Sequence, residues 1–259
     1  MARFNALLFT GLLVILAGCA GMPRQPTLAT VISRNTDAMG GLEASKRVRS
    51  IRYYLTITEP KFQVQGVYTA DRRGRARIDI FHQGRRVFSE AFDGEKAWQM
   101  TADGKATPSS ASGAANLRDG AEFPGKLLTL GELNSVGARL SLLPDETIEG
   151  SEYHVLRLVR RDDTSVLLYV NPDTWLIDWQ REDAALHPDL DATQKSMQTH
   201  MTGYRQVGAV IRSYDSVQRD LRDGRIVQKT GASRIILNVP VNDAMFSPGS
   251  PPPVTRLKQ

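Results

Sequence analysis

Residues 51–58 read IRYYLTIT, an alternation of apolar and polar side chains that predicts a β-strand with one buried face. The apolar positions are Ile51, Tyr53, Leu55 and Ile57. Because successive side chains of a strand point to opposite faces of a sheet, these four are expected on the same face. The period of two therefore indicates a sheet with one side turned toward a protein interior.

The same alternation continues to residue 100, in segments that end in residues typical of turns. The turns are expected at residues 60–61, 71–74, 83–84 and 93–94. Asp93-Gly94 is the strongest of these signals, because this dipeptide favours a two-residue hairpin turn. The short links predict an antiparallel meander rather than parallel strands joined by helices.

The rest of the chain adds helices before and after this meander and then further strands. Thr27 is expected to cap a helix that Gly40-Gly41 ends, and a second short helix is expected over residues 42–48. Two more short helices are expected over residues 114–123 and 126–133. Strands are expected at residues 139–143, 146–149, 153–160, 165–170, 174–181, 195–205, 209–222 and 225–239. Trp175, Ile177 and Trp179 would share one face of their strand, as core or cavity wall.

The N-terminus has the parts of a secretory signal. Arg3 precedes an apolar run over residues 6–15, which ends in Leu16-Ala17-Gly18-Cys19. This tetrapeptide matches the bacterial lipobox, in which the chain is cut before a cysteine whose thiol takes the lipid. We therefore predict a signal peptide over residues 1–18, fatty acylation such as palmitate at Cys19, and a tether over residues 19–26. An ordinary signal peptide or a short membrane anchor is the alternative.

Composition is that of a soluble globular protein. The 259 residues are 41% apolar, the mean hydropathy is −0.30 and the formal net charge is +5. With its one cysteine lipidated, the chain has no thiol left for a disulfide. A basic cluster in the meander either faces anionic lipid, or protects an edge strand or keeps the surface soluble. Its members are Arg72, Arg73, Arg75, Arg77, Arg85 and Arg86.

Nothing in the sequence indicates catalysis. The four histidines have no metal-ligand spacing, and the loop from His187 to Asp191 is more typical of a solvated acidic turn. Nucleophile-elbow, Walker and dinucleotide-binding patterns are absent from the sequence. We therefore expect no catalytic residue, no metal, no cofactor and no enzymatic activity. A cell-envelope location also excludes nucleic acid as a partner.

Several short motifs resemble one family in their order and spacing. They are AMGGL at 38–42, FDGEKAWQM at 92–100, Glu149-Gly150, NPDT at 171–174 and LNVPVNDAMF at 237–246. Together they are similar to bacterial outer-membrane lipoprotein-sorting-like proteins, related to the LolA/LolB lipoprotein carrier and receptor. The resemblance covers about Thr27 to Ser247. Asn171 stands where such proteins often have Asp, and residues 211–213 stand where a Phe-Pro is expected.

The resemblance implies a mainly β fold with helices. Its strongly curved antiparallel sheet would form an incomplete barrel, closed by helices over an apolar cavity. The pattern alone is also compatible with a β-sandwich. The domain would span residues 27–247, followed by a disordered proline-rich tail over residues 248–259. The residues expected to line the cavity are Ile51, Tyr53, Leu55, Ile57, Val64, Ile78, Ile80, Leu156, Leu158, Trp175, Ile177 and Trp179.

The expected function follows from the anchor and the cavity together. The protein would be held in the cell envelope by Cys19, most simply at the outer membrane facing the periplasm, because Ala20 follows the cysteine. It would bind a lipid or a lipoprotein acyl chain non-covalently, in lipid or lipoprotein trafficking. The alternative is an interaction or sensor protein that contacts an envelope protein partner and has its cavity filled by side chains.

Overall fold

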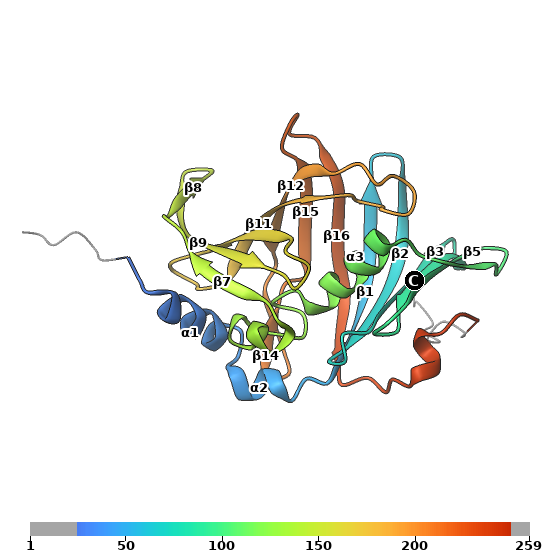
Figure 1. The fold of residues 1–259 in the computed structure, drawn as a ribbon, viewed down its shortest axis with the longest axis horizontal. Coiled ribbons are helices and arrows are strands. Elements are labelled where there is room, and N and C mark those ends of the chain that lie inside the picture. The colour runs from blue at the N-terminus through green and yellow to red at the C-terminus, as the bar shows by residue number, and fades with distance from the viewer. Residues whose placement is uncertain (1–24, 250–259) are drawn as a thin grey trace, which may run out of the picture.

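The computed structural model describes residues 25–249, which form one large curved antiparallel sheet with a few helices (Figure 1). The signal peptide, Cys19, most of the tether and most of the proline-rich tail lie outside the described residues, so those expectations remain predictions. The helices are α1 (Leu28–Ala38), α2 (Leu42–Lys46), α3 (Ala111–Glu122), η1 (Leu130–Val136) and η2 (Asp243–Phe246). Within residues 25–249, no helix combines the length and the hydropathy needed to cross a membrane.

The strands occupy both halves of the chain. Those of the first half are β1 (Ser50–Glu59), β2 (Phe62–Asp71), β3 (Ala76–His82), β4 (Arg85–Phe92), β5 (Ala97–Thr101) and β6 (Ala106–Pro108). Those of the second half are β7 (Arg139–Leu142), β8 (Glu146–Ile148), β9 (Ser151–Val159), β10 (Ser165–Val170), β11 (Ile177–Ala184), β12 (Lys195–Thr202), β13 (Arg205–Val207), β14 (Val210–Arg212), β15 (Asp215–Asp220) and β16 (Ile226–Leu237).

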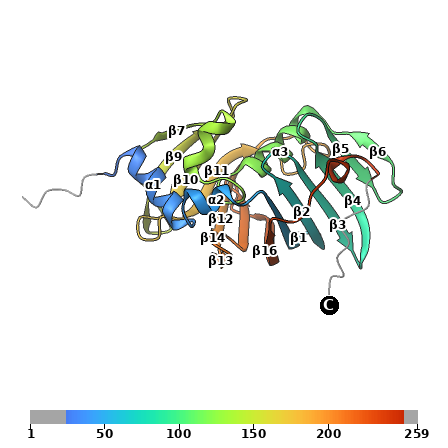
Figure 2. The same cartoon turned by 90° about the horizontal axis from the view of Figure 1, so that it is seen from below.

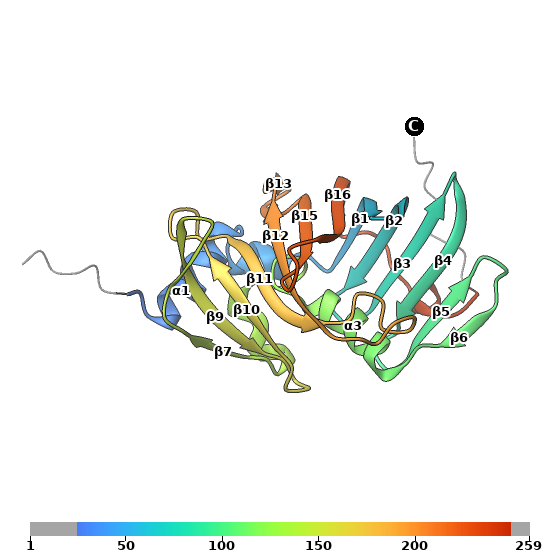
Figure 3. The ribbon, with the colours of Figure 1, turned by 90° about the horizontal axis from the view of Figure 1, so that it is seen from above.

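The two halves join in a 14-stranded sheet within the described part of the chain. Its order is β6-β5-β4-β3-β2-β1-β16-β15-β12-β11-β10-β9-β7, with β8 paired to β9. The first meander therefore meets the last strand through the β1–β16 pair, while β6 and β7 remain at the two edges. Figure 3 shows the sheet as an arc with α3 on its open side. This arrangement confirms the predicted incomplete barrel and excludes the sandwich.

Two helical groups cover parts of the concave face (Figure 2). Val31 of α1 and Leu130 and Leu133 of η1 pack on Leu156, Leu158 and Leu168 in one buried cluster. Ala121 of α3 and Leu127, which follows it, pack on Tyr53 and Tyr68 in a second cluster. Both clusters lie on the face of the sheet that the alternation in β1 predicted to point inward.

The predicted ends of α1 are confirmed. The Thr27 side chain accepts a hydrogen bond from the Thr30 amide at 3.2 Å, and Gly40 and Gly41 follow with φ of 108° and 85°. A Cβ at Gly40 would come within 2.4 Å of the Ala209 carbonyl oxygen, so this position also needs a glycine for space.

The turn at Asp93-Gly94 differs from the prediction of a two-residue hairpin. Phe92 pairs with Ala97, which leaves a four-residue loop between β4 and β5. The Asp93 carboxylate accepts hydrogen bonds from the amides of Glu95 and Lys96, at 2.9 and 2.8 Å. An aspartate that bonds to the backbone two residues on builds its own turn, and this contact sets the longer loop. Gly94 has the expected positive φ, at 107°.

The shared face predicted for Trp175, Ile177 and Trp179 is wrong. Tyr169 pairs with Trp179 and Val170 pairs with Ile177, so β11 has one extra residue, Asp178, in a β-bulge. The bulge reverses the alternation. Ile177 points to the concave face, and Trp175, in the turn before β11, packs against the same cluster. Trp179 is buried on the convex face with Tyr153 and Tyr169.

The structure also differs from the sequence-based expectations for one helix and for part of the basic cluster. The helix expected over residues 126–133 begins only at Leu130 and is a 3₁₀ helix. Within the basic cluster, Arg75 and Arg77 are buried and pair with Asp71 at 2.5 Å and Asp79 at 2.7 Å. These two arginines therefore neutralise buried carboxylates and do not face a lipid surface.

Candidate functional site

The concave face of β1–β4 presents most of the predicted cavity residues. The register places Tyr53 opposite Tyr68, Leu55 opposite Gly66 and Ile57 opposite Val64. Tyr68 and Gly66 in turn pair with Ile78 and Ile80 of β3, so these side chains share the inward face.

Leu55, Val64, Ile78 and Ile80 are only half-buried, whereas Ile51 is fully buried beside α3 and α2. Leu156, Leu158 and Ile177 lie on the same face of the other half-sheet, sealed beneath α1 and η1.

A loop crosses this face from the middle of the sheet to the first meander (Figure 3). We call residues 185–194 the strap. The Asp189 carboxylate accepts a hydrogen bond from the Ser110 amide at the N-terminus of α3, at 2.7 Å. His187 Nε2 lies 2.9 Å from Glu59 Oε1 at the end of β1. A carboxylate at a helix N-terminus is favoured by the helix dipole, so the strap is held where the concave face opens.

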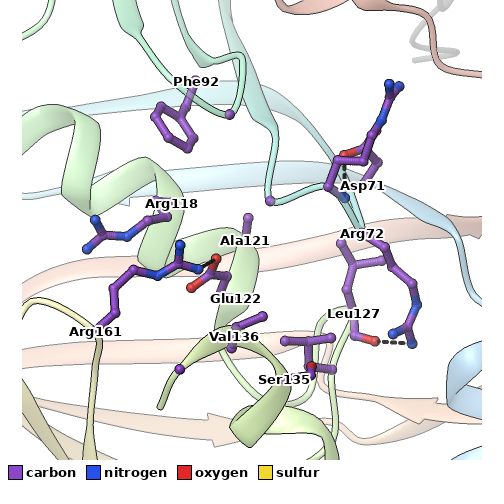
Figure 4. A pocket seen from close by; sticks show the side chains of 15 residues that line it. Asp71, Arg72, Phe92, Arg118, Ala121, Glu122, Leu127, Ser135, Val136 and Arg161 are labelled. Carbon is purple, nitrogen blue, oxygen red and sulfur yellow. Dashed lines mark hydrogen bonds and ion pairs between the residues drawn. The ribbon is translucent and has the colours of Figure 1, made fainter.

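Two cavities flank α3. The inner cavity, of about 350 Å³, lies between α3, the strap and strands β11, β12 and β15. The outer cavity, of about 450 Å³, lies between α3, η1 and the β2–β3 turn (Figure 4). Both have apolar walls, which include Phe123 and Met201 in the inner cavity and Phe92 and Leu127 in the outer one. Charged side chains also line both cavities, and none of the twelve side chains predicted to line a cavity is among those that line these two.

A network of ion pairs holds α3 in place between the two cavities. Arg118 contacts Asp119 and Asp162, and Arg160 contacts Asp119 at 3.5 Å and Glu182 at 2.9 Å. In the outer cavity, Arg161 lies against Glu122 (Figure 4). Burial raises the pKa of Asp119, and the coulombic attraction of Arg160 opposes this effect. The network joins α3 to the β9–β10 turn and to β11, so α3 is held firmly over the sheet.

Among the titratable groups on the concave side, a lysine and a glutamate have pKa values that are shifted toward neutral pH. Burial lowers the pKa of Lys126 to about 8, with a smaller opposing effect from the charge of Glu182. Burial also raises the pKa of Glu90, on β4, to about 7, and the nearby charge of Asp189 adds to this effect. Perturbed groups that gather in a cleft are typical of functional sites, although structural networks also produce them.

Sequence reasoning missed α3's ion pairs, Lys126 and the role of the strap. In the strap, the sequence singles out only His187 and the aspartates, and it predicts a solvated acidic loop. In the structure, Asp189 and His187 instead tie the strap to α3 and β1. Among residues 25–249, no three His, Cys, Asp or Glu side chains gather as metal ligands would.

The fold has counterparts among solved structures. No protein-family model matches the chain, and no curated protein matches it in sequence. Solved structures do match. A putative outer membrane lipoprotein-sorting protein domain from Vibrio parahaemolyticus aligns with a TM-score of 0.54 and 10% identity, over 79% of this chain and 93% of its own. A LolA superfamily protein from Nitrosomonas europaea aligns with a TM-score of 0.53 and 14% identity, over 86% and 98%.

A third solved structure, a DUF1329 family protein from Desulfovibrio piger, has a TM-score of 0.57 and 10% identity, over 86% of this chain and 98% of its own. At these identities the likeness concerns the fold alone. The chain has the LolA-like fold that its motifs indicated: a large antiparallel sheet, curved and not closed, with helices on its concave side.

Proposed function

We propose that this chain, with its LolA-like fold, is a lipid-anchored envelope protein that binds a lipid or lipoprotein acyl chain on its concave face. Binding would be non-covalent and would involve no catalysis. The observation that carries the proposal is the row of half-buried apolar side chains on β1–β3, Leu55, Val64, Ile78 and Ile80. The strand register places this row on the same face of the sheet as Met201 and Ser216, which line the inner cavity. Each methylene moved from water to such a surface contributes about 0.8 kcal/mol.

The fold supports this proposal through the proteins that share it. One of the matching structures is described as an outer membrane lipoprotein-sorting protein domain, and another belongs to the LolA superfamily. A carrier of acyl chains in the periplasm fits both descriptions. The lipobox at Leu16-Ala17-Gly18-Cys19 supports anchoring by lipid at the outer membrane, with the described domain on the periplasmic side.

The test places a charge on the proposed binding face. Leu55 is half-buried, so in Leu55→Glu the carboxylate can reach water if the face is open, and the fold is expected to survive. Uptake of a fluorescent fatty-acid probe should then fall at least tenfold, because the acyl chain meets a charge. The matched control is Thr58→Glu on the convex face of the same strand, which should bind like the wild type.

The outcomes separate the two candidate functions. An unfolded Leu55→Glu protein would mean that the face is packed shut, and would favour contact with an envelope protein partner instead. A folded variant with undiminished uptake would show that acyl chains do not bind on this face.

A further inference from the structure

Lys126 differs from every other charged side chain of the inner cavity. The charged residues that line it are Asp119, Lys126, Arg160, Asp162, Glu182 and Asp183. Arg160 pairs with Asp119 and Glu182, Arg118 pairs with Asp162, and Ser196 donates a hydrogen bond to Asp183. Among the described residues, only the Lys126 ammonium has neither an ion pair nor a hydrogen bond within this group.

The position of Lys126 is fixed by its surroundings. It follows the Pro124-Gly125 break after α3, and its backbone carbonyl accepts a hydrogen bond from Arg212 Nε at 2.8 Å. Its Nζ lies 4.8 Å from the centre of the Tyr68 ring, a cation–π contact. That contact offsets part of the cost of a partly buried charge, but an ammonium has three donors and the ring accepts none of them as a full hydrogen bond.

Lys126 also stands beside the apolar face. Tyr68 pairs directly with Ile78, and Ile57 is joined through Thr230 of β16 to Ser216, which lines the inner cavity. A ligand whose polar end meets Lys126 can therefore lay an apolar chain past Tyr68 along β1–β3. We propose that Lys126 is the polar anchor of the lipid site and binds the oxygen end of an acyl group, a carboxylate or an acyl carbonyl. This inference rests on the proposed function.

The charges that line the inner cavity limit which polar group a ligand can present to Lys126. Its lining has four carboxylates, Asp119, Asp162, Glu182 and Asp183, against two cations, Lys126 and Arg160. The pairing of Arg118 with Asp119 and Asp162 still leaves an excess of one negative charge. A multiply charged headgroup such as a phosphate monoester would be repelled by this excess. A single carboxylate or a neutral ester carbonyl satisfies the ammonium at less cost, and Gln180, Thr199 and Ser216 add neutral polar groups to the lining.

The test uses Lys126→Met, which keeps the length of the side chain and removes its charge. The matched control is Lys229→Met, an exposed lysine on the convex face of β16. Calorimetry would measure binding of decanoate and of its glycerol monoester to the soluble protein that lacks residues 1–19. We expect Lys126→Met to melt at the wild-type temperature or above it, because it removes an unpaired charge, and to bind decanoate at least tenfold more weakly. Lys126→Arg should keep most of the affinity.

The two ligands identify the oxygen that Lys126 contacts. If Lys126→Met weakens the binding of decanoate alone, Lys126 contacts a carboxylate. If it weakens the binding of both ligands, Lys126 contacts an acyl carbonyl. Both results support the anchor. Wild-type affinity of Lys126→Met for both ligands would overturn the anchor and leave the proposed function standing. A lowered melting temperature for Lys126→Met, with binding lost to the same extent in Lys126→Arg, would assign the residue a structural role and overturn the anchor too. If the wild type binds neither ligand, both the anchor and the proposed function fail.

Discussion

Glu90 links the stability of the domain to pH. Its pKa is raised from 4.5 to about 7, first by burial and then by the charge of Asp189 in the strap. The folded state therefore holds the proton more tightly than the unfolded state does. The resulting stability is fully present below pH 4.5 and is lost as the pH rises through about 7. The cause is the desolvated carboxylate, which has no ion pair to compensate it among the described residues.

Glu90→Gln should remove the free-energy cost of burying an ionised carboxylate, because an amide stays neutral at every pH. We expect the variant to be more stable than the wild type at pH 8, by on the order of 1–3 kcal/mol, and equally stable at pH 4. Urea unfolding at the two pH values measures the difference, with the exposed Glu95→Gln as control. An equal gain at both pH values would show that the effect comes from packing and not from ionisation.

The strap depends on the absence of a side chain at Gly113 of α3. A Cβ at this position would come within 2.5 Å of Asp189 Oδ2. Because the opposing atoms end a flexible side chain, Gly113→Ala should leave α3 in place, and alanine favours the helix. The Asp189 contact with the Ser110 amide should break, and the strap should open.

Hydrogen exchange checks this expectation. The amides of Leu190 and Asp191, which donate to the His187 carbonyl in the closed strap, should exchange at least tenfold faster in Gly113→Ala. Gly120→Ala is the control in the same helix, since its Cβ would meet only Lys126 Nζ, at 3.8 Å. Unchanged protection in Gly113→Ala would mean that Asp189 does not hold the strap.

The strands were predictable because their signal is local. The alternation in β1–β3 placed Ile51, Tyr53, Leu55 and Ile57 on the inward face, and the register confirms this. The errors come from contacts that alternation does not contain. The bulge at Asp178 reversed the side of Trp179, and the Asp93 side chain lengthened its own turn.

The candidate site was less predictable than the sheet, because its parts are distant in sequence. Asp189 and Ser110 are 79 residues apart, and Arg118 and Asp162 are 44 apart. Lys126 gave no signal at all, since a lone lysine after a helix is ordinarily a solvated residue. Only the folded chain places it beneath Tyr68 beside a cavity.

Attachment to the membrane is a separate claim and has its own test. Cys19 lies outside the described residues, and the domain is predicted to begin at Thr27. Cys19→Ser should therefore leave the melting temperature unchanged and release the protein from the membrane fraction. Radiolabelled palmitate should label the wild type alone. Acyl labelling of the serine variant would mean that lipid is attached elsewhere or that the lipobox is misassigned.

In the molecule as a whole, the curved sheet, α3 and the strap surround the concave face on which the proposed acyl chain would bind. The most direct measurement is mass spectrometry of lipids that co-purify with the soluble form lacking residues 1–19, made in a bacterial periplasm. Leu55→Glu protein, purified in parallel, gives the background. The account predicts acyl lipid near one molecule per wild-type protein and a clear loss in the variant. Wild-type protein that holds no more lipid than the folded variant would contradict it.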